Sequence, residues 1–390
     1  LAHYMPAKFS RKFTSIQREL LTEVIYIARH GGYQSIADRR GGGKTSITEG
    51  AIIYIICNGL RHFPVVTAAT GDDAARILAN MKYEFEANPQ LFEDYPEICA
   101  PIWALEGAPQ RAAMQTVDGK RTYLKWGTDH VRFPRIDGSP ASGAIMAARG
   151  LDGAVRGLKF GDDRPDFLLI DDPDSRESAN SETQTRSREE IIERDLGGLA
   201  GPGIRVASMM LCTIQNRRCI AFKYTDRPQK PAWRGRRRGL IQKWPDRIDL
   251  WDEYIALRQK GMQNEKSPDP EGRAAHNYYL KHRKAMDRGA EVADTHCFVD
   301  EVLDDGSQVE SSTLEYAYNI ISDRGLDAFL TEYQNEPPEE ETPQEIGITA
   351  NLVQERINGL DKWVVPADCQ IVTAGIDLAS VPVRARIAAA

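Results

Sequence analysis

The stretch Ala37-Asp38-Arg39-Arg40-Gly41-Gly42-Gly43-Lys44-Thr45-Ser46 decides the fold of this chain of 390 residues. Small and apolar residues at 34–37 indicate a short buried strand before it, and the apolar run 51–57 indicates a buried helix after it. A strand, a glycine-rich turn, a Lys-Thr pair and a helix, in this order, are typical of a phosphate-binding loop. The backbone N–H groups of the turn and the positive end of the helix dipole would surround an anion.

This loop predicts the roles of several side chains at a nucleotide. Lys44 would reach the β- and γ-phosphates, and the Thr45 hydroxyl would bind Mg²⁺. The remaining residues expected to contact the nucleotide here are Arg40, Gly41, Gly42, Gly43 and Ser46. Asp38 occupies the first glycine position of the pattern G-x-x-x-x-G-K-[ST], so the fit is incomplete. The alternative interpretation is a glycine-rich loop with an incidental lysine.

Length and composition bound the possible classes of protein. The chain is long enough for two domains and the start of a third, and its apolar content of 41% is enough for real cores. No apolar run approaches the ~20 residues of a membrane span, so we expect no membrane association. The six cysteines lack C-x-x-C spacing and are typical of reduced cytosolic thiols. A net charge of −7 argues against wholesale coating of nucleic acid, but it permits a local basic track.

Strand and helix patterns alternate along the first two thirds of the chain. A buried strand at 63–69 precedes an amphipathic helix at 70–88, and a hairpin is expected around 127–130. Further buried strands are expected at 143–148, 167–170 and 206–213. This alternation is typical of a parallel sheet covered by helices. The predicted fold class is therefore α/β, a P-loop NTPase with a mainly parallel sheet, followed by a small, mostly helical subdomain.

Two carboxylates, Asp171 and Asp172, follow the strand predicted at 167–170. Ligands of open α/β sheets bind at the carboxyl ends of the strands. One carboxylate would hold Mg²⁺ and the other would polarise the attacking water. The alternative is a strand that runs into an acidic turn. Together with the glycine-rich loop, the pair favours a nucleotide site.

Other candidates have competing interpretations. Gln17, on a helix predicted over 9–30, would read adenine or would be a solvated surface residue. Thr213 and Gln215, at the end of the strand 206–213, would transmit hydrolysis to the rest of the protein or would cap the strand. A basic run flanked by tryptophans would contact DNA phosphates or would simply be solvated; its residues are Arg234, Arg236, Arg237, Arg238 and Lys243.

The composition divides the chain into four predicted parts. These are a P-loop ATPase core at 1–232, a helical subdomain with the basic run at 233–335, an acidic and proline-rich linker at 336–368, and a final strand region at 369–390. The last part contains a buried strand that ends in Asp377.

The ordered set of motifs resembles the large terminase subunit of tailed bacteriophages, which packages DNA into a procapsid. The similarity runs from Gln17 to Asp377 and includes the loop, the acidic strand and the segment 328–337. The resemblance implies an ASCE-type P-loop ATPase with an RNase H-like nuclease domain, using ATP and Mg²⁺. It also implies double-stranded DNA, the small terminase subunit and a portal or procapsid as partners, a homo-oligomeric ring, and action in the bacterial host cytoplasm.

The same resemblance implies roles for individual residues. Arg40 matches the arginine of the terminase loop, and Arg156 matches an arginine that acts in trans, with Arg149 competing for that role. Asp172 stands where the family more often has Glu, while Thr213 and Gln215 match the coupling motif. Asp377 matches the first metal ligand of the nuclease. Only thirteen residues follow it, none of them acidic, so we expect the nuclease to be incomplete.

Two other functions remain open at this stage. The first is a helicase-like P-loop translocase that works outside packaging. The second is a prophage remnant that binds nucleotide without turnover, for which Asp172 and the incomplete nuclease give a reason.

Overall fold

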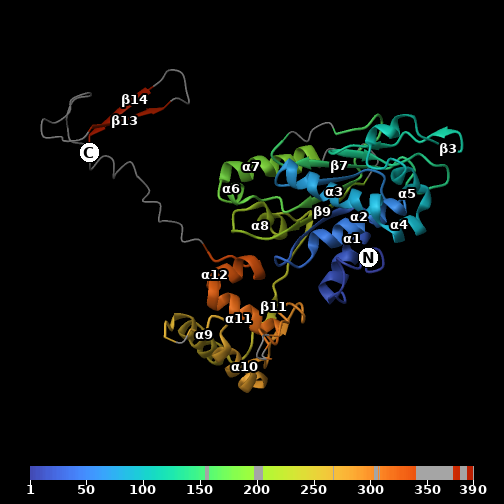
Figure 1. The fold of residues 1–390 in the computed structure, drawn as a ribbon. Helices are drawn as coiled ribbons and strands as arrows, with labels where there is room; N and C mark the ends of the chain where they lie inside the picture. Colours follow the sequence, from blue (N-terminus) through green and yellow to red (C-terminus); the bar gives the residue numbers. More distant parts are fainter. Residues whose placement is uncertain are drawn as a thin grey trace. The chain divides into compact units, whose positions relative to one another are not determined.

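The structure is a computed structural model that describes residues 1–153, 158–196, 205–266, 268–302, 306, 308–339, 372–377 and 384–389 (Figure 1). It divides into a unit of residues 1–338 and a unit of residues 339–390, and each is considered by itself. Of the first unit, nearly all predicted elements lie in the described ranges.

An eight-stranded sheet with the order β10-β1-β9-β8-β2-β7-β6-β5 forms the centre of the first unit. The strands from β10 to β7 run parallel to one another, and β6 and β5 are antiparallel. The predicted mainly parallel α/β sheet is therefore present. The strands are β1 (Gly32–Ala37), β2 (Pro64–Ala68), β5 (Lys125–Trp126), β6 (His130–Arg132), β7 (Ile145–Gly150), β8 (Phe167–Asp171), β9 (Ala207–Cys212) and β10 (Trp233–Arg237).

Helices cover both faces of this sheet because its central strands are apolar on both sides. In β8, Phe167 and Leu169 join the core on one face, whereas Leu168 and Ile170 join the core on the other. The first face is covered by α1 (Ser15–His30), α2 (Lys44–Cys57), α3 (Gly71–Ala87), α4 (Pro89–Asp94) and α5 (Pro96–Trp103). The second is covered by α6 (Arg176–Ala179), α7 (Glu182–Glu190), the π-helical turn η2 (Ile191–Leu196) and α8 (Ile220–Thr225).

A small insertion lies between α5 and the antiparallel strands. It contains the 3₁₀ helix η1 (Pro109–Met114) and a two-stranded ribbon of β3 (Thr116–Val117) and β4 (Lys120–Arg121). The predicted hairpin around 127–130 is confirmed by the antiparallel pairing of β5 with β6.

The basic run lies in the sheet, which corrects the prediction that it opens the helical subdomain. Residues 233–237 form β10, an edge strand that pairs in parallel with β1. Trp233 and Gly235 are buried, while Arg234 and Arg236 on the alternate positions are exposed. The arginines thus have the period-two pattern of a strand at the edge of a sheet.

The helical part that follows has its own core of aromatic side chains, in which Trp251 stacks on Tyr318. Its elements are β11 (Ile241–Lys243), α9 (Ile248–Gln263), α10 (Arg273–Met286), β12 (Glu291–Val292), α11 (Thr313–Arg324), α12 (Leu326–Phe329) and the π-helical turn η3 (Leu330–Gln334). The prediction of a mostly helical region after the sheet is confirmed.

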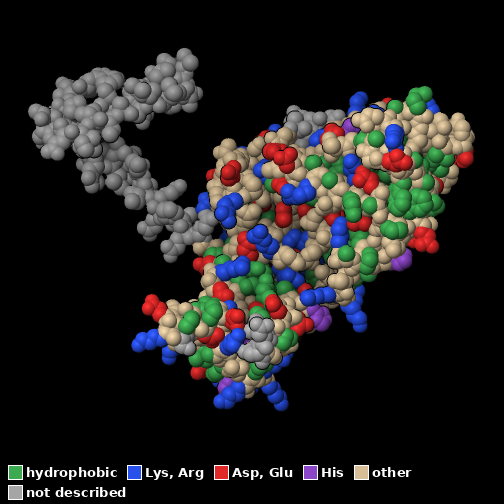
Figure 2. Space-filling model, viewed as in Figure 1, with side chains coloured by type: hydrophobic (Ala, Val, Ile, Leu, Met, Phe, Trp, Pro, Cys, Tyr) green, Lys and Arg blue, Asp and Glu red, His purple; other side chains and the backbone are tan. Residues whose placement is uncertain are grey.

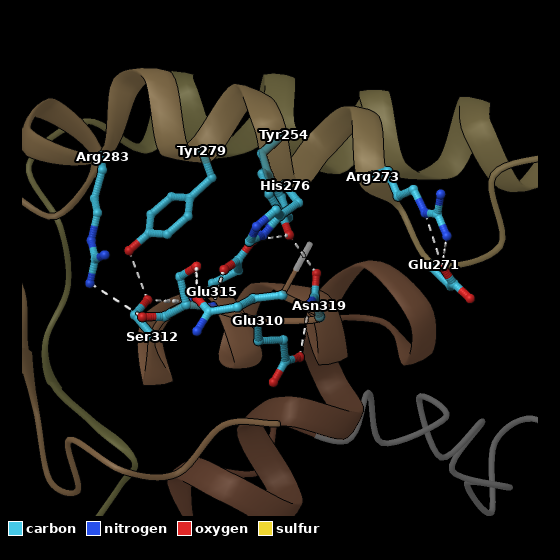
Figure 3. Close-up of polar contacts among 12 residues, drawn as sticks. Tyr254, Glu271, Arg273, His276, Tyr279, Arg283, Glu310, Ser312, Glu315 and Asn319 are labelled. Atoms are coloured by element: carbon cyan, nitrogen blue, oxygen red, sulfur yellow. Dashed lines mark hydrogen bonds and ion pairs between the residues drawn. The ribbon is translucent and has the colours of Figure 1, made fainter. Parts of the chain in front are cut away.

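A buried polar network joins these helices. Figure 3 shows His276 of α10 and Tyr254 of α9 directed at Glu315 of α11. The Glu315 carboxylate accepts hydrogen bonds from the Tyr254 hydroxyl (3.2 Å) and from the backbone N–H of Ser311 (2.7 Å), and it lies 2.8 Å from His276 Nδ1. Ser312 caps α11 by accepting from Glu315 N–H. The capping Ser predicted at 312 is present, but Glu315 is turned into the core.

The second unit contains an antiparallel pair of strands, β13 (Val372–Asp377) and β14 (Arg384–Ala389). The strand predicted to end in Asp377 is therefore present, but its side chain and the predicted linker from residue 340 onward lie outside the described parts. Within the described parts, no helix is both long and apolar enough to cross a membrane.

Candidate functional site

The parallel strands bring the predicted loop and the predicted acids to one edge of the sheet. Ala37 at the end of β1 is in register with Cys212 at the end of β9, and Ala68 of β2 is in register with Asp171 of β8. The segments that follow these strand ends are therefore neighbours. Residues from widely separated parts of the sequence meet here, as the sequence predicts.

Residues 38–43 form the turn between β1 and α2. Gly41 has φ = 74° and Gly43 has φ = 81°, a left-handed conformation that favours glycine. A Cβ atom on Gly42 would lie 3.2 Å from the Arg39 carbonyl oxygen, so the turn has little room for a side chain there. The three glycines are thus required by the path of the backbone.

Lys44 is the first residue of α2, and its side chain turns back into the loop. Its ammonium group donates to the carbonyl oxygens of Asp38 (2.8 Å) and Arg39 (3.1 Å) and to Thr213 Oγ1 (3.1 Å). Lys44 is 7% exposed, and so its charge is held at a buried position between the loop and the end of β9. This placement suits a cation that binds phosphate oxygens.

Thr45 connects the loop to the acidic strand. Its hydroxyl donates to Asp171 Oδ2 at 2.9 Å. The other carboxylate oxygen, Asp171 Oδ1, is buried and accepts no hydrogen bond from any described residue. Burial, and then the neighbouring Asp172, raises the pKa of Asp171 to about 7.

The pair of Thr45 and Asp171 fits the coordination chemistry of Mg²⁺. This ion takes one or two protein oxygens in nucleotide sites and keeps waters on its other positions. A cation would satisfy the buried Asp171 oxygen and would favour the ionised carboxylate. Among the described residues there is no cluster of three or more His, Cys, Asp or Glu side chains that could hold a metal.

Asp172 lies at the mouth of the site in a strained backbone conformation, with φ = 38°. Its Oδ1 accepts from Thr213 N–H at 3.0 Å, and its own N–H donates to Leu211 O at 2.8 Å. Desolvation raises the pKa of Asp172, and the nearby Lys44 charge opposes that shift, although the residue keeps contact with solvent. An exposed carboxylate beside a buried lysine can orient a water molecule.

A pocket of about 440 Å³ adjoins the loop. The loop contributes Arg39, Gly41 and Gly43, and α1 contributes Gln17. The other walls come from the N-terminal segment and the helical part, and include Phe9, Phe13, Phe298 and Tyr316. Aromatic walls next to a phosphate-binding turn suit a planar base.

The amide of Gln17 is occupied inside the protein. Its Oε1 accepts from Thr14 N–H at 3.1 Å, and its Nε2 donates to Gly42 O at 3.1 Å. Gln17 therefore ties the first turn of α1 to the glycine turn. Neither of the two interpretations from sequence, a base reader or a solvated surface residue, included this bond to the loop.

We expect Gln17→Glu to weaken ATP, GTP and inorganic tripolyphosphate to a similar degree, about five- to thirty-fold. The variant keeps the acceptor for Thr14 but places an oxygen against Gly42 O, which disturbs the phosphate turn rather than a base contact. Equilibrium binding of the three ligands measures this. Thr22→Ala, which removes an exposed hydrogen bond from the same helix, is the control. A loss confined to ATP would show instead that Gln17 reads adenine.

The arginines predicted to act at the phosphates have different environments. Arg40 is exposed on the loop, and its guanidinium pairs with Glu332 of η3 at 3.2 Å. Arg149, at the end of β7, lies 3.6 Å from Asp129. Arg156 lies outside the described residues, so the choice between Arg149 and Arg156 stays a prediction.

Most of the basic run is engaged within the protein. Arg236 and Arg238 both pair with Glu19 and Glu23, two carboxylates one turn apart on α1. Arg237 donates to Phe222 O at 2.9 Å and stacks on the Phe222 ring.

These contacts favour a structural role for that part of the run. Arg234 lies over the Tyr26 ring, and Lys243 is exposed on β11. On the face drawn in Figure 2, Lys and Arg side chains are interspersed with Asp and Glu side chains. DNA contact by these residues stays a prediction.

The predicted coupling residues occupy adjacent positions with different contacts. Thr213 touches both Lys44 and Asp172, as described above, whereas the Gln215 amide donates to Asp174 O at 3.1 Å. Asp174 in turn accepts from the first backbone N–H groups of α8. Gln215 thus supports the turn that follows the acidic strand.

Sequence reasoning missed the residues through which the helical part touches the loop. Arg39 and Asp294 form an ion pair of 2.6 Å between largely buried side chains. Glu332 and Asn335, from the segment after α12, contact the loop and the end of β9. The stretch 328–337 resembles terminases as a motif, but the sequence contained no signal for these contacts.

No family model and no curated protein matches this chain. Among solved structures, it is similar to the large terminase ATPase domain of Thermus phage P74-26, with 14% identity, 68% of this chain and 99% of that chain covered, and a TM-score of 0.34. It is also similar to the large terminase of a thermophilic bacteriophage (8% identity, 58% and 46% covered, TM-score 0.34) and to the Phi-28 gp11 DNA packaging motor (12%, 67% and 66%, 0.27). TM-scores this low carry no argument about function.

Proposed function

We propose that residues 1–338 form an ATP-hydrolysing motor of the kind found in phage large terminases. The observation that carries the proposal is the convergence of the loop, the acidic strand and the end of β9. Thr45 bonds Asp171, Lys44 bonds Thr213, and Thr213 bonds Asp172. The placement of β9 between β1 and β8 also agrees with the ASCE type of P-loop ATPase.

Each residue of the site has a task in phosphoryl transfer. The loop N–H groups and Lys44 bind the phosphates, and the pocket beside Gln17 holds the nucleoside. Thr45 and Asp171 hold Mg²⁺, which neutralises charge that develops on the transferred phosphoryl group. Asp172 orients the attacking water, and Arg40 or an arginine from a neighbouring subunit stabilises the transition state.

Packaging of double-stranded DNA is the finer part of the proposal. It is supported by the order of the motifs from Gln17 to Asp377, which resembles terminases over most of the chain. On this proposal the partners are DNA, a portal or procapsid, the small terminase subunit and further copies of the chain in a ring. A nuclease would require residues beyond Asp377.

The first test is hydrolysis by Lys44→Ala. Because the buried ammonium is lost, ATP hydrolysis, with and without double-stranded DNA, is expected to fall by about 10²-fold or more. Lys284→Ala, which removes an exposed lysine of α10, is the control and should keep the parent rate. Hydrolysis by Lys44→Ala at the parent rate would refute the proposed site.

Two further measurements separate the alternatives. Strand separation on a forked duplex would favour a helicase-like translocase over a packaging motor. Nucleotide binding without hydrolysis by the parent chain would favour a remnant that has lost turnover, with Asp172 as the first residue to examine.

A further inference from the structure

The segment that follows α12 contacts three loops around the proposed ATP site. Arg40 N–H donates to Glu332 O at 3.0 Å, and Leu240 N–H donates to Tyr333 O at 2.8 Å. The Gln334 amide pairs with both the N–H and the carbonyl of Ile241. These bonds attach the end of the helical part to the phosphate loop and to the segment after β10.

Asn335 completes this segment and is fully buried. Its backbone is left-handed, with φ = 55°, a conformation that Asn and Gly tolerate better than other residues. Its side chain uses both ends of the amide: Oδ1 accepts from Ile214 N–H at 2.9 Å, and Nδ2 donates to Arg238 O at 2.9 Å. A single side chain thus joins the segment after β9 to the segment after β10.

The bond to Ile214 acts on the residue next to it. Thr213 gives its N–H to Asp172 Oδ1 and accepts from Lys44 at its hydroxyl. Because Ile214 N–H is fixed by Asn335, the peptide plane between Thr213 and Ile214 is fixed as well. The positions of Asp172 and Lys44 then depend on a residue that itself lies outside the reacting groups.

We propose that Asn335 is a positioning residue for ATP hydrolysis, which sets Thr213 and through it the Asp172 carboxylate. This inference rests on the function proposed above and extends it to control by the helical part. A displacement of about 1 Å at reacting groups costs about 10²-fold in rate, so a loosened Thr213 slows hydrolysis strongly. Nucleotide binding depends mainly on the loop and is affected less.

The test compares Asn335→Gly with the parent chain. Glycine keeps the left-handed backbone and removes both side-chain hydrogen bonds. We expect kcat to fall about 10- to 100-fold, while the Kd of a non-hydrolysable ATP analogue changes less than about three-fold. Rates are measured well below the unfolding temperature of each variant. Asp118→Gly, at an exposed left-handed position of the β3–β4 ribbon, is the control and should keep the parent kcat.

A double-mutant cycle with Thr213→Ala distinguishes positioning from stability alone. If Asn335 acts through Thr213, the loss in kcat from Asn335→Gly is much smaller when Thr213 is already Ala. Full multiplication of the two losses, or an Asn335→Gly variant with the parent kcat, would overturn the role of Asn335 and leave the proposed function intact. A parent chain that hydrolyses no ATP would overturn both.

Discussion

At pH 8 the Asp171→Asn variant is expected to be more stable than the parent chain by about 1–3 kcal/mol, and to lose ATP hydrolysis by about 10²-fold or more. The stability gain arises because Asp171 Oδ1 is buried without a partner and the carboxylate is ionised at this pH. The loss of activity arises because an amide replaces the anionic oxygen expected to hold Mg²⁺. The amide also lacks a partner at that oxygen position, which limits the gain.

The pH dependence has a definite sign. The pKa of Asp171 is raised by burial from 3.8 to about 7 in the folded protein. Below pH 4 the carboxyl is protonated in both the folded and unfolded states, and it costs nothing. Between pH 4 and 7 the unfolded state ionises first, so the parent loses stability as the pH rises. The advantage of Asp171→Asn should grow over this window and level off above pH 7.

Chemical unfolding of both proteins from pH 4.5 to 8.5 measures this advantage. Asp172→Asn is the matched control, because Asp172 keeps solvent contact, its Oδ1 retains the acceptor for Thr213 N–H, and Asn tolerates a left-handed backbone. It should change stability less than Asp171→Asn. An Asp171→Asn variant that is less stable than the parent at pH 8 would contradict the account of the orphaned oxygen.

The sheet was predictable where its strands are buried on both faces. Phe167–Asp171 reads as a continuous apolar run that ends in a carboxylate, and its neighbours on both sides contribute similar runs. The parallel arrangement then places the loop and the two acids at one edge, so most of the ATP site follows from the pattern. Asp171 and Thr45 needed no tertiary information beyond that arrangement.

The edge strand β10 was not predictable in the same way. Its exposed positions carry arginines, because an edge strand needs only one buried face, and a run of arginines suggests nucleic acid when read alone. A signal was available on the partner side. Glu19 and Glu23 lie one turn apart on a predicted helix and form the anionic pair that receives Arg236 and Arg238.

The role of Asn335 could not be read from local sequence. Its partners Ile214 and Arg238 lie 121 and 97 positions away, and no periodicity connects them. Gln17 presents the same limitation over a shorter distance, since its bond to Gly42 depends on how α1 packs beside the loop. Local patterns identified the chemical groups of the site, whereas the contacts that hold them in place depend on the completed fold.

The second large effect is expected from Glu315→Ala, which should lower the free energy of unfolding by about 3–5 kcal/mol. Glu315 has no exposed surface, and its carboxylate contacts Tyr254, His276 and Ser311 N–H (Figure 3). Truncation leaves these groups unpaired in the core of the helical part and also opens a cavity.

Glu253→Ala is the matched control for this prediction. Glu253, on α9, also accepts a tyrosine hydroxyl, that of Tyr278 at 2.7 Å, but the contact is exposed. Its removal should cost less than about 0.5 kcal/mol, because water replaces the lost partner. Equal losses from the two substitutions would show that burial does not set the value of the Glu315 contacts. A large loss from Glu315→Ala alone would instead show that the helical part is held together by its buried polar network as well as by its aromatic core.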